Sequence, residues 1–75
     1  MSVTLHTGLW ARKYIEQGDL QLQLAEGSVV ADALAELVIP PDEIGIILIN
    51  GKAVSRSTAL VDGDILEVLP LIIGG

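Results

Sequence analysis

Residues 20–24 read Leu-Gln-Leu-Gln-Leu, and this strict alternation limits the possible folds more than any other segment. In an extended chain successive side chains point to opposite faces, so the leucines share one face and the glutamines share the other. A strand with one apolar and one polar face is typical of a sheet that is covered on one side and solvated on the other. The segment therefore predicts a sheet with one dry face.

A helix that packs on this sheet is predicted from Ser28 to near Val38. Its apolar residues recur at i, i+3, i+4 and i+7 and so form one stripe: Val30, Ala33, Leu34 and Leu37. The hydroxyl of Ser28 is suited to cap the first turn. Pro40 and Pro41 donate no backbone hydrogen bond and restrict the residues before them, so the helix should end near Val38.

Four more segments have the composition of strands: residues 3–6, 44–49, 52–54 and 65–69. The second of these is nearly all apolar, which predicts a central strand that is covered on both faces or placed at an interface. Asn50-Gly51 favours a type I′ turn after it, and Asp62-Gly63-Asp64 favours a tight turn into the last strand.

The elements follow one another as strand, strand, helix, strand, short strand and strand. This order predicts the α+β class, with a mixed four- to five-stranded sheet and one main helix packed across it. The first and last strands are expected to form the central, parallel pair. Residues 1–69 should form this domain, and residues 70–75 a flexible C-terminal tail.

Residues 9–15 are expected to form a short helical or irregular turn. Trp10 and Tyr14 are four residues apart within it, and a packing or lid role is favoured over a role as a partner hot spot. Arg12 and Lys13 beside them are expected to form a solvated face.

The sequence argues against a metal or catalytic site built by the domain itself. His6 is the single histidine and cysteine is absent, so His6 is not expected to bind a metal. Asp62-Gly63-Asp64 lacks the other ligands of a calcium loop and is interpreted as a turn. The sequence contains neither a glycine-rich nucleotide motif nor a hydrolase triad. Asp42-Glu43 is interpreted as a solvated loop pair, with docking to a basic partner surface as the open alternative.

Size and charge narrow the function further. Because 75 residues bury only a thin core, we expect one small domain and no self-contained enzyme. The formal charge of -6 disfavours nucleic acid and membrane surfaces as partners, and it favours a basic protein surface. The longest aliphatic run is residues 44–49, well short of the roughly 20 residues of a membrane span. With no signal peptide visible, a cytoplasmic location is expected.

The last six residues, Pro70 to Gly75, are the most informative about function. Pro70 is expected to mark the point where the chain leaves the sheet. Three large aliphatic residues follow, and at a free terminus they are suited to insertion into another protein. Gly74 and Gly75 have no Cβ atom, so they can thread a narrow channel and present a terminal carboxylate to a buried active site.

Four segments together follow a known pattern: Glu26-Gly27-Ser28-Val29, Ile49-Asn50-Gly51-Lys52, Leu60 to Ile65, and Pro70 to Gly75. On these segments, which extend over nearly the whole chain, it resembles the MoaD/ThiS sulfur-carrier proteins of the ubiquitin-like β-grasp fold. The resemblance implies that a ubiquitin-activating-type enzyme uses ATP to adenylate the carboxylate of Gly75. Sulfur from a donor protein then replaces AMP and gives a thiocarboxylate.

The same resemblance implies a role for the rest of the tail. Gly74 is the slim residue that lets Gly75 reach the active site of the partner. The residues expected to insert with it are Pro70, Leu71, Ile72 and Ile73. The domain itself is then expected to bind no cofactor and to catalyse no reaction, because the partner enzymes supply the catalysis.

The resemblance leaves the pathway open between two acceptors. Pro70 within the tail slightly favours the large subunit of molybdopterin synthase, and the short length points to thiazole synthase of the thiamine branch. Two other functions stay open: a ubiquitin-like modifier joined through Gly75 to lysines of other proteins, and a non-covalent β-grasp binding module. The chain departs from many relatives in lacking Phe and in residues 9–19, so no partner contacts are transferred from that segment.

Overall fold

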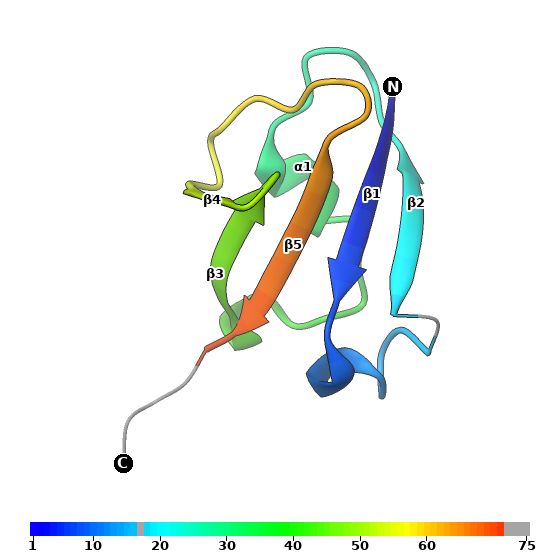
Figure 1. Ribbon diagram of the computed structural model, residues 1–75, viewed down its shortest axis with the longest axis vertical. Coiled ribbons are helices and arrows are strands. Elements are labelled where there is room, and N and C mark those ends of the chain that lie inside the picture. Colours follow the sequence, from blue (N-terminus) through cyan, green and yellow to red (C-terminus); the bar gives the residue numbers. More distant parts are fainter. Residues whose placement is uncertain (17, 72–75) are drawn as a thin grey trace.

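The computed structural model describes residues 1–16 and 18–71, which form one mixed sheet with a short helix packed on it (Figure 1). Its strands are β1 (Ser2–Thr7), β2 (Asp19–Gln23), β3 (Ile44–Ile49), β4 (Lys52–Val54) and β5 (Ile65–Pro70). The helices are α1 (Val30–Leu34) and two short 3-10 helices, η1 (Leu9–Ala11) and η2 (Pro41–Glu43). The predicted α+β class and the predicted mixed sheet are confirmed.

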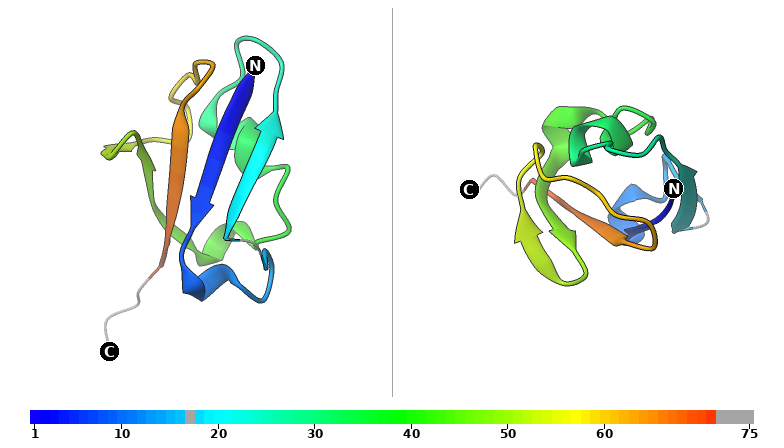
Figure 2. Two further views of the ribbon diagram at one scale, coloured as in Figure 1. Left: turned by 45° about the vertical axis from the view of Figure 1, so that its right-hand side comes forward. Right: turned by 90° about the horizontal axis from the view of Figure 1, so that it is seen from above.

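The strands lie side by side in the order β2-β1-β5-β3-β4. β1 is antiparallel to β2 and parallel to β5, whereas β3 is antiparallel to both β5 and β4. The first and last strands therefore form the central parallel pair, as the sequence predicts. Figure 2 shows α1 on one side of the sheet. We call the opposite side the outer sheet face.

The core lies between α1 and the sheet. Its fully buried side chains come mainly from the two central strands and the helix: Val3, Leu5, Val30, Leu66 and Val68. Leu22 of β2 is buried on the same side, while Gln21 and Gln23 are exposed on the outer sheet face. The alternation in residues 20–24 is thus realised as one apolar and one polar face.

The predicted cap of the helix is wrong. The Ser28 hydroxyl does not cap α1, because it donates a hydrogen bond to the carbonyl oxygen of Ala25 (2.7 Å). Val29 is the capping position instead. Its N–H donates to the carboxylate of Asp32 (2.8 Å), which places a negative charge in the first turn, where the helix dipole favours it.

The predicted end of the helix near Val38 is also wrong, since α1 ends at Leu34. The cause is Ile39, which is buried with 2% exposure. At about 100° per residue a continuing helix would place Ile39 on the side opposite Val30, in solvent. The chain therefore leaves the helix early, through two 3-10-type hydrogen bonds, Glu36 N–H to Ala33 (3.1 Å) and Leu37 N–H to Leu34 (3.1 Å).

β3 is an interior strand whose two faces differ. Ile44 and Ile47 are buried, whereas Ile46 on the outer sheet face is 54% exposed. Among the residues that the structure describes, β3 is therefore not covered on both faces. Placement of this strand at an interface stays a prediction.

The two predicted turns are confirmed. Asn50 and Gly51 both have positive φ, 50° and 87°, as a type I′ turn requires. In the second turn Gly63 has φ 89° and the Asp64 N–H donates to the carbonyl of Val61 (3.1 Å). The Asn50 side chain joins the turns, because its oxygen accepts from the Ile65 N–H (3.0 Å). No helix in the described part of the chain has the length and apolar character needed to cross a membrane.

The central position of β5 can be tested by replacing one of its buried side chains. Leu66→Ala should lower the free energy of unfolding by about 2–5 kcal/mol, because it removes buried apolar atoms and leaves a cavity. Ile65→Ala is the matched control, since Ile65 is adjacent but 51% exposed. In urea unfolding monitored by Trp10 fluorescence, the control should lower the free energy of unfolding by less than about 1 kcal/mol. Equal losses for the two variants would show that β5 is not the buried centre of the sheet.

Candidate functional site

The candidate site begins where β5 ends, because the tail singled out in the sequence starts there (Figure 1). Of its predicted site residues, Ile72, Ile73, Gly74 and Gly75 lie outside the described residues. Pro70 is the last residue of β5, one residue later than the expected end of that strand. It lies opposite Ile44 of β3.

Leu71 is held at its backbone while its side chain faces solvent. Its N–H donates a hydrogen bond to the carbonyl oxygen of Glu43 (2.8 Å), and its side chain is exposed. The chain is thus fixed up to Leu71 by η2 and β3. We call the four residues that meet here the tail base: Glu43, Gly45, Pro70 and Leu71.

Gly45 allows the tail base to close. A Cβ atom on Gly45 would lie 2.8 Å from the carbonyl oxygen of Pro70 and 2.9 Å from the Cα of Leu71, closer than real Cβ contacts. The register between β3 and β5 also shifts between Ile44 and Ile47, so β3 is irregular at this point. This role of Gly45 was not predicted from the sequence. The available signal was a glycine inside a β-branched run, which often marks a close backbone approach.

Glu43 corrects the interpretation of Asp42-Glu43 as a solvated loop pair. Its carboxylate accepts a hydrogen bond from the Tyr14 hydroxyl (2.6 Å) and lies 4.0 Å from the Lys13 ammonium nitrogen. Because η2 folds Glu43 against the segment after β1, the same residue contacts Tyr14 with its side chain and Leu71 with its backbone. Contacts between residues so far apart in the sequence cannot be predicted from local sequence patterns.

Tyr14 is kept in its protonated, hydrogen-bond-donating form by this contact. The hydrogen bond to Glu43 raises the pKa of the Tyr14 phenol above its ordinary value of 10.0. Partial loss of solvent and the negative charges of Glu43 and Asp42 raise this pKa further. The Tyr14 hydroxyl therefore donates to Glu43 throughout the neutral pH range.

Trp10 secures the end of β5 from the other side. Its indole N–H donates to the carbonyl oxygen of Val68 (3.3 Å), just where β1 ends at Thr7. Trp10 and Tyr14 both pack against the hydrophobic core, which confirms the predicted packing role. Arg12 and Lys13 between them are exposed, as expected.

The outer sheet face divides into two halves. Over β1 and β2 it is polar, and there the His6 imidazole Nδ1 pairs with a carboxylate oxygen of Asp19. Over β3, β4 and β5 it is largely apolar. We call these residues the apolar half-face: Ile46, Leu48, Ala53, Ile65 and Leu69. Exposed apolar residues gathered on one face are typical of a protein-binding surface.

The apolar half-face and the tail base are continuous. Leu69 immediately precedes Pro70 in β5, and Ile46 follows Gly45 in β3. A partner that covers this half-face therefore also reaches the point where the tail leaves the sheet. Glu67 lies between the apolar residues and opposite Leu48, so the surface carries one acidic group near its centre.

Other candidate residues have structural partners. Within residues 1–16 and 18–71, no three His, Asp or Glu side chains come together to hold a metal ion. Asp62 accepts from the Ser2 N–H (2.6 Å) and Asp64 accepts from the Val61 N–H (2.9 Å), which confirms that this segment is a turn. A hollow of about 240 Å³ beside α1 has Arg56 as its only ionisable lining residue. It therefore contains no acid–base pair.

Comparisons with known proteins agree with this architecture. A sequence model of the ThiS family matches residues 10–75 of this chain. Among curated proteins no match is found. Similar solved structures include small archaeal modifier protein 1 of Haloferax volcanii, with 20% identity, TM-score 0.81, and 95% of this chain and 98% of that chain covered.

Two further structures come from molybdopterin-related proteins. A putative molybdopterin converting factor subunit 1 of Pyrococcus furiosus has 23% identity and TM-score 0.80, with 96% of this chain and 99% of that chain covered. A complex of subunits 1 and 2 of molybdopterin-converting factor from Helicobacter pylori gives 20% identity and TM-score 0.67, with both chains fully covered, 100% and 100%. These likenesses confirm the ubiquitin-like β-grasp fold.

Because the backbone of Pro70 and Leu71 approaches Gly45 closely, a single methyl group added at Gly45 should destabilise the fold measurably. Gly45→Ala should lower the free energy of unfolding by about 1–3 kcal/mol and shift the amide resonance of Leu71, because backbone atoms must move apart. Gly8→Ala is the control, since its Cβ would meet two atoms of the Trp10 side chain, at 3.3 and 3.9 Å, and no backbone atom. Similar effects of the two substitutions on Leu71 would contradict the role given to Gly45.

The contact between Tyr14 and Glu43 predicts an unusual titration. Tyr14 is the single tyrosine, so tyrosinate absorbance reports on it alone, and its midpoint should lie above 10.0. Because the raised pKa favours the neutral phenol, this contribution to stability is complete below the ordinary pKa of 10.0 and is lost as the pH rises from there through the raised midpoint. Glu43→Gln should move the midpoint back toward 10.0. An unchanged midpoint in this variant would exclude Glu43 as the cause.

Proposed function

The chain belongs to the ThiS family of sulfur-carrier proteins, and we propose that it carries sulfur as a thiocarboxylate on Gly75. The observation that carries this proposal is the family match, which extends over residues 10–75 and therefore includes the tail. The described residues support it with a fold whose central strand β5 ends at Pro70, where the tail begins, and with Leu71 exposed next to it.

The chemistry requires activation, because a carboxylate is a poor electrophile. A ubiquitin-activating-type enzyme joins the Gly75 carboxylate to the α-phosphate of ATP, and pyrophosphate leaves. A sulfide equivalent from a sulfur donor protein then attacks the acyl carbon, and AMP leaves. The absence of cysteine is compatible with this scheme, because the sulfur is carried on the main-chain terminus. ATP belongs to the activating partner, and the carrier itself binds no cofactor.

The tail residues have distinct tasks in this proposal. Gly74 and Gly75 fit a narrow channel because they lack side chains. Leu71, Ile72 and Ile73 offer apolar contacts to the channel entrance, and Pro70 ends the strand from which they leave. Since the Leu71 N–H is held by Glu43, the tail base defines where insertion begins.

The apolar half-face is proposed as the surface on which the activating enzyme and the sulfur acceptor dock. It adjoins the tail base, so docking there brings the tail to the partner. The formal charge of -6 favours a partner with basic residues around an apolar centre. As acceptor we favour the large subunit of molybdopterin synthase, followed by thiazole synthase. The likeness to subunit 1 of molybdopterin-converting factors supports that order.

A second candidate function is that of a ubiquitin-like modifier. The observation that favours it is the likeness to small archaeal modifier protein 1, whose name describes a modifier. In that case the activated Gly75 is transferred to lysine side chains of other proteins. Adenylation comes first in both functions, so isopeptide-linked adducts that survive reductant distinguish the modifier. In the third alternative, a non-covalent binding module, the last two glycines are dispensable.

Two kinds of variant test separately whether adenylation depends on the tail and on the apolar half-face. In ATP–pyrophosphate exchange with a cognate activating enzyme, deletion of Gly74 and Gly75 should abolish the reaction. Ile46→Asp should weaken it at least about tenfold, because it places a charge within an apolar contact. Val61→Asp is the control, since Val61 is 65% exposed at the far end of β5 from the tail.

Two results would contradict the proposal. Full exchange after the deletion would exclude Gly75 as the activated group and would favour the non-covalent module. Equal loss in Ile46→Asp and Val61→Asp would exclude the apolar half-face as the docking surface.

A further inference from the structure

β2 is a free edge of the sheet. Within residues 1–16 and 18–71 it pairs only with β1, whereas the other edge strand, β4, has three residues and begins with Lys52. β2 has five residues, Asp19 to Gln23, and contains neither proline nor lysine. Its register with β1 is regular along its whole length. Apart from the charge of Asp19 at its first position, it lacks the devices by which proteins usually protect a sheet edge from pairing with another strand.

The hydrogen bonds at both ends of β2 show which of its backbone groups face outward. Met1 and Leu24 exchange both backbone bonds (2.7 and 2.9 Å), and the Thr7 N–H donates to Gly18 (2.8 Å). In an antiparallel pair such bonded positions alternate with non-bonded ones. Leu20 and Leu22 therefore bond to β1. The N–H and C=O groups of Gln21 and Gln23 point away from it.

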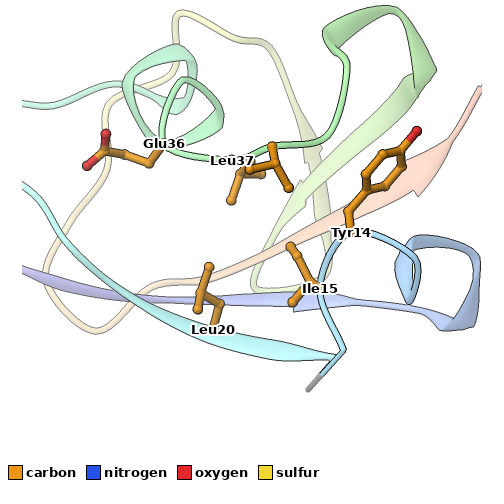
Figure 3. A pocket seen from close by; sticks show the side chains of 6 residues that line it. Tyr14, Ile15, Leu20, Glu36 and Leu37 are labelled. Atoms are coloured by element: carbon orange, nitrogen blue, oxygen red, sulfur yellow. The ribbon is translucent and has the colours of Figure 1, made fainter.

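A hollow of about 230 Å³ lies on the helix side of this edge (Figure 3). Its lining comes from the end of the segment after β1, from β2 and from the turn after α1: Tyr14, Ile15, Leu20, Glu36, Leu37 and Val38. In Figure 3, Leu37 faces Ile15 and Leu20 across it. Val38 at its rim is 71% exposed. A strand added to β2 would direct every second side chain toward this apolar lining.

The charges around this edge indicate which kind of partner segment would bind there. Glu16, Asp19 and Glu36 lie beside the hollow or at the start of β2, and the whole chain carries -6. The nearby cations are fewer than the carboxylates: Arg12 donates to the carbonyl oxygen of Glu16 (3.0 Å), and Lys13 lies near Glu43. A second copy of the chain would bring like charges together. A basic partner would be attracted.

We propose that the free edge of β2 and the hollow beside it bind an extended segment of a partner protein that has alternating apolar residues flanked by lysine or arginine. The segment adds to the sheet as a strand through the backbone of Gln21 and Gln23, and its apolar side chains enter the hollow. β1 lies between β2 and β5, the nearest strand of the apolar half-face, and the hollow is on the opposite, helix side of the sheet. The two surfaces can therefore be occupied together, and this site is independent of the chemistry proposed at Gly75.

The test uses the acetylated and amidated peptide Lys-Lys-Ile-Thr-Val-Thr-Ile-Lys-Lys with the full chain. Binding should move the amide resonances of Gln21 and Gln23 downfield and slow their hydrogen exchange, because these groups gain hydrogen bonds. Gln21→Pro should weaken binding at least about tenfold, since proline removes an N–H that β1 does not use. Gln21→Ala is the matched control and should bind as the wild type does, because it keeps the N–H.

A second pair of measurements serves if Gln21→Pro fails to fold. Methylation of alternate peptide backbone nitrogens should abolish binding to the wild-type chain, and replacement of the four lysines by glutamates should weaken it strongly. Val38→Ser, at an exposed position, should reduce affinity without affecting folding. The proposal would be overturned if hydrogen exchange at Gln21 and Gln23 did not slow on binding. It would also be overturned if Gln21→Pro and Gln21→Ala bound equally well, or if the methylated peptide bound as well as the unmethylated one.

Discussion

The rest of the structure depends on the parallel pairing of β1 with β5 at the centre of the sheet. In this pair Leu5 lies beside Leu66 and Thr7 beside Val68, and the three apolar side chains are fully buried under α1. Because β5 is central and is the last strand, its far end delivers the tail at the border between η2 and β3. Because α1 covers one face of the sheet, the other face is left for partners. The direction of one strand thus places both the tail base and the apolar half-face.

Local sequence patterns predicted those elements that depend on interactions between neighbouring residues. The alternation in residues 20–24 and the turn at Asn50-Gly51 need only neighbouring residues, and both are present in the structure. The helix end could not be predicted from its own stripe, because burial of Ile39 against the core overrides it. Ser28 failed as a cap because Val29 occupies the capping position and the Ser28 hydroxyl donates to the carbonyl oxygen of Ala25.

The candidate site was predicted unevenly for a similar reason. The importance of the tail is readable from its composition, whereas its support comes from residues far apart in sequence. Tyr14 meets Glu43, Glu43 meets Leu71, and Gly45 meets Pro70. Each of these contacts requires the complete sheet, so neither the spacing nor the composition of the chain reveals it. The segment after β1, from which no partner contacts were transferred, supplies the aromatic side chains that brace the tail base.

The central claim is that Gly75 carries sulfur, and the mass of the carboxyl-terminal peptide tests it most directly. The full chain is incubated with its activating enzyme, ATP and a sulfur source, then digested and measured by mass spectrometry. The account predicts a gain equal to the exchange of one oxygen for one sulfur, located on Gly75 and absent without ATP. An unmodified terminal peptide from a chain that the same enzyme adenylates would contradict it.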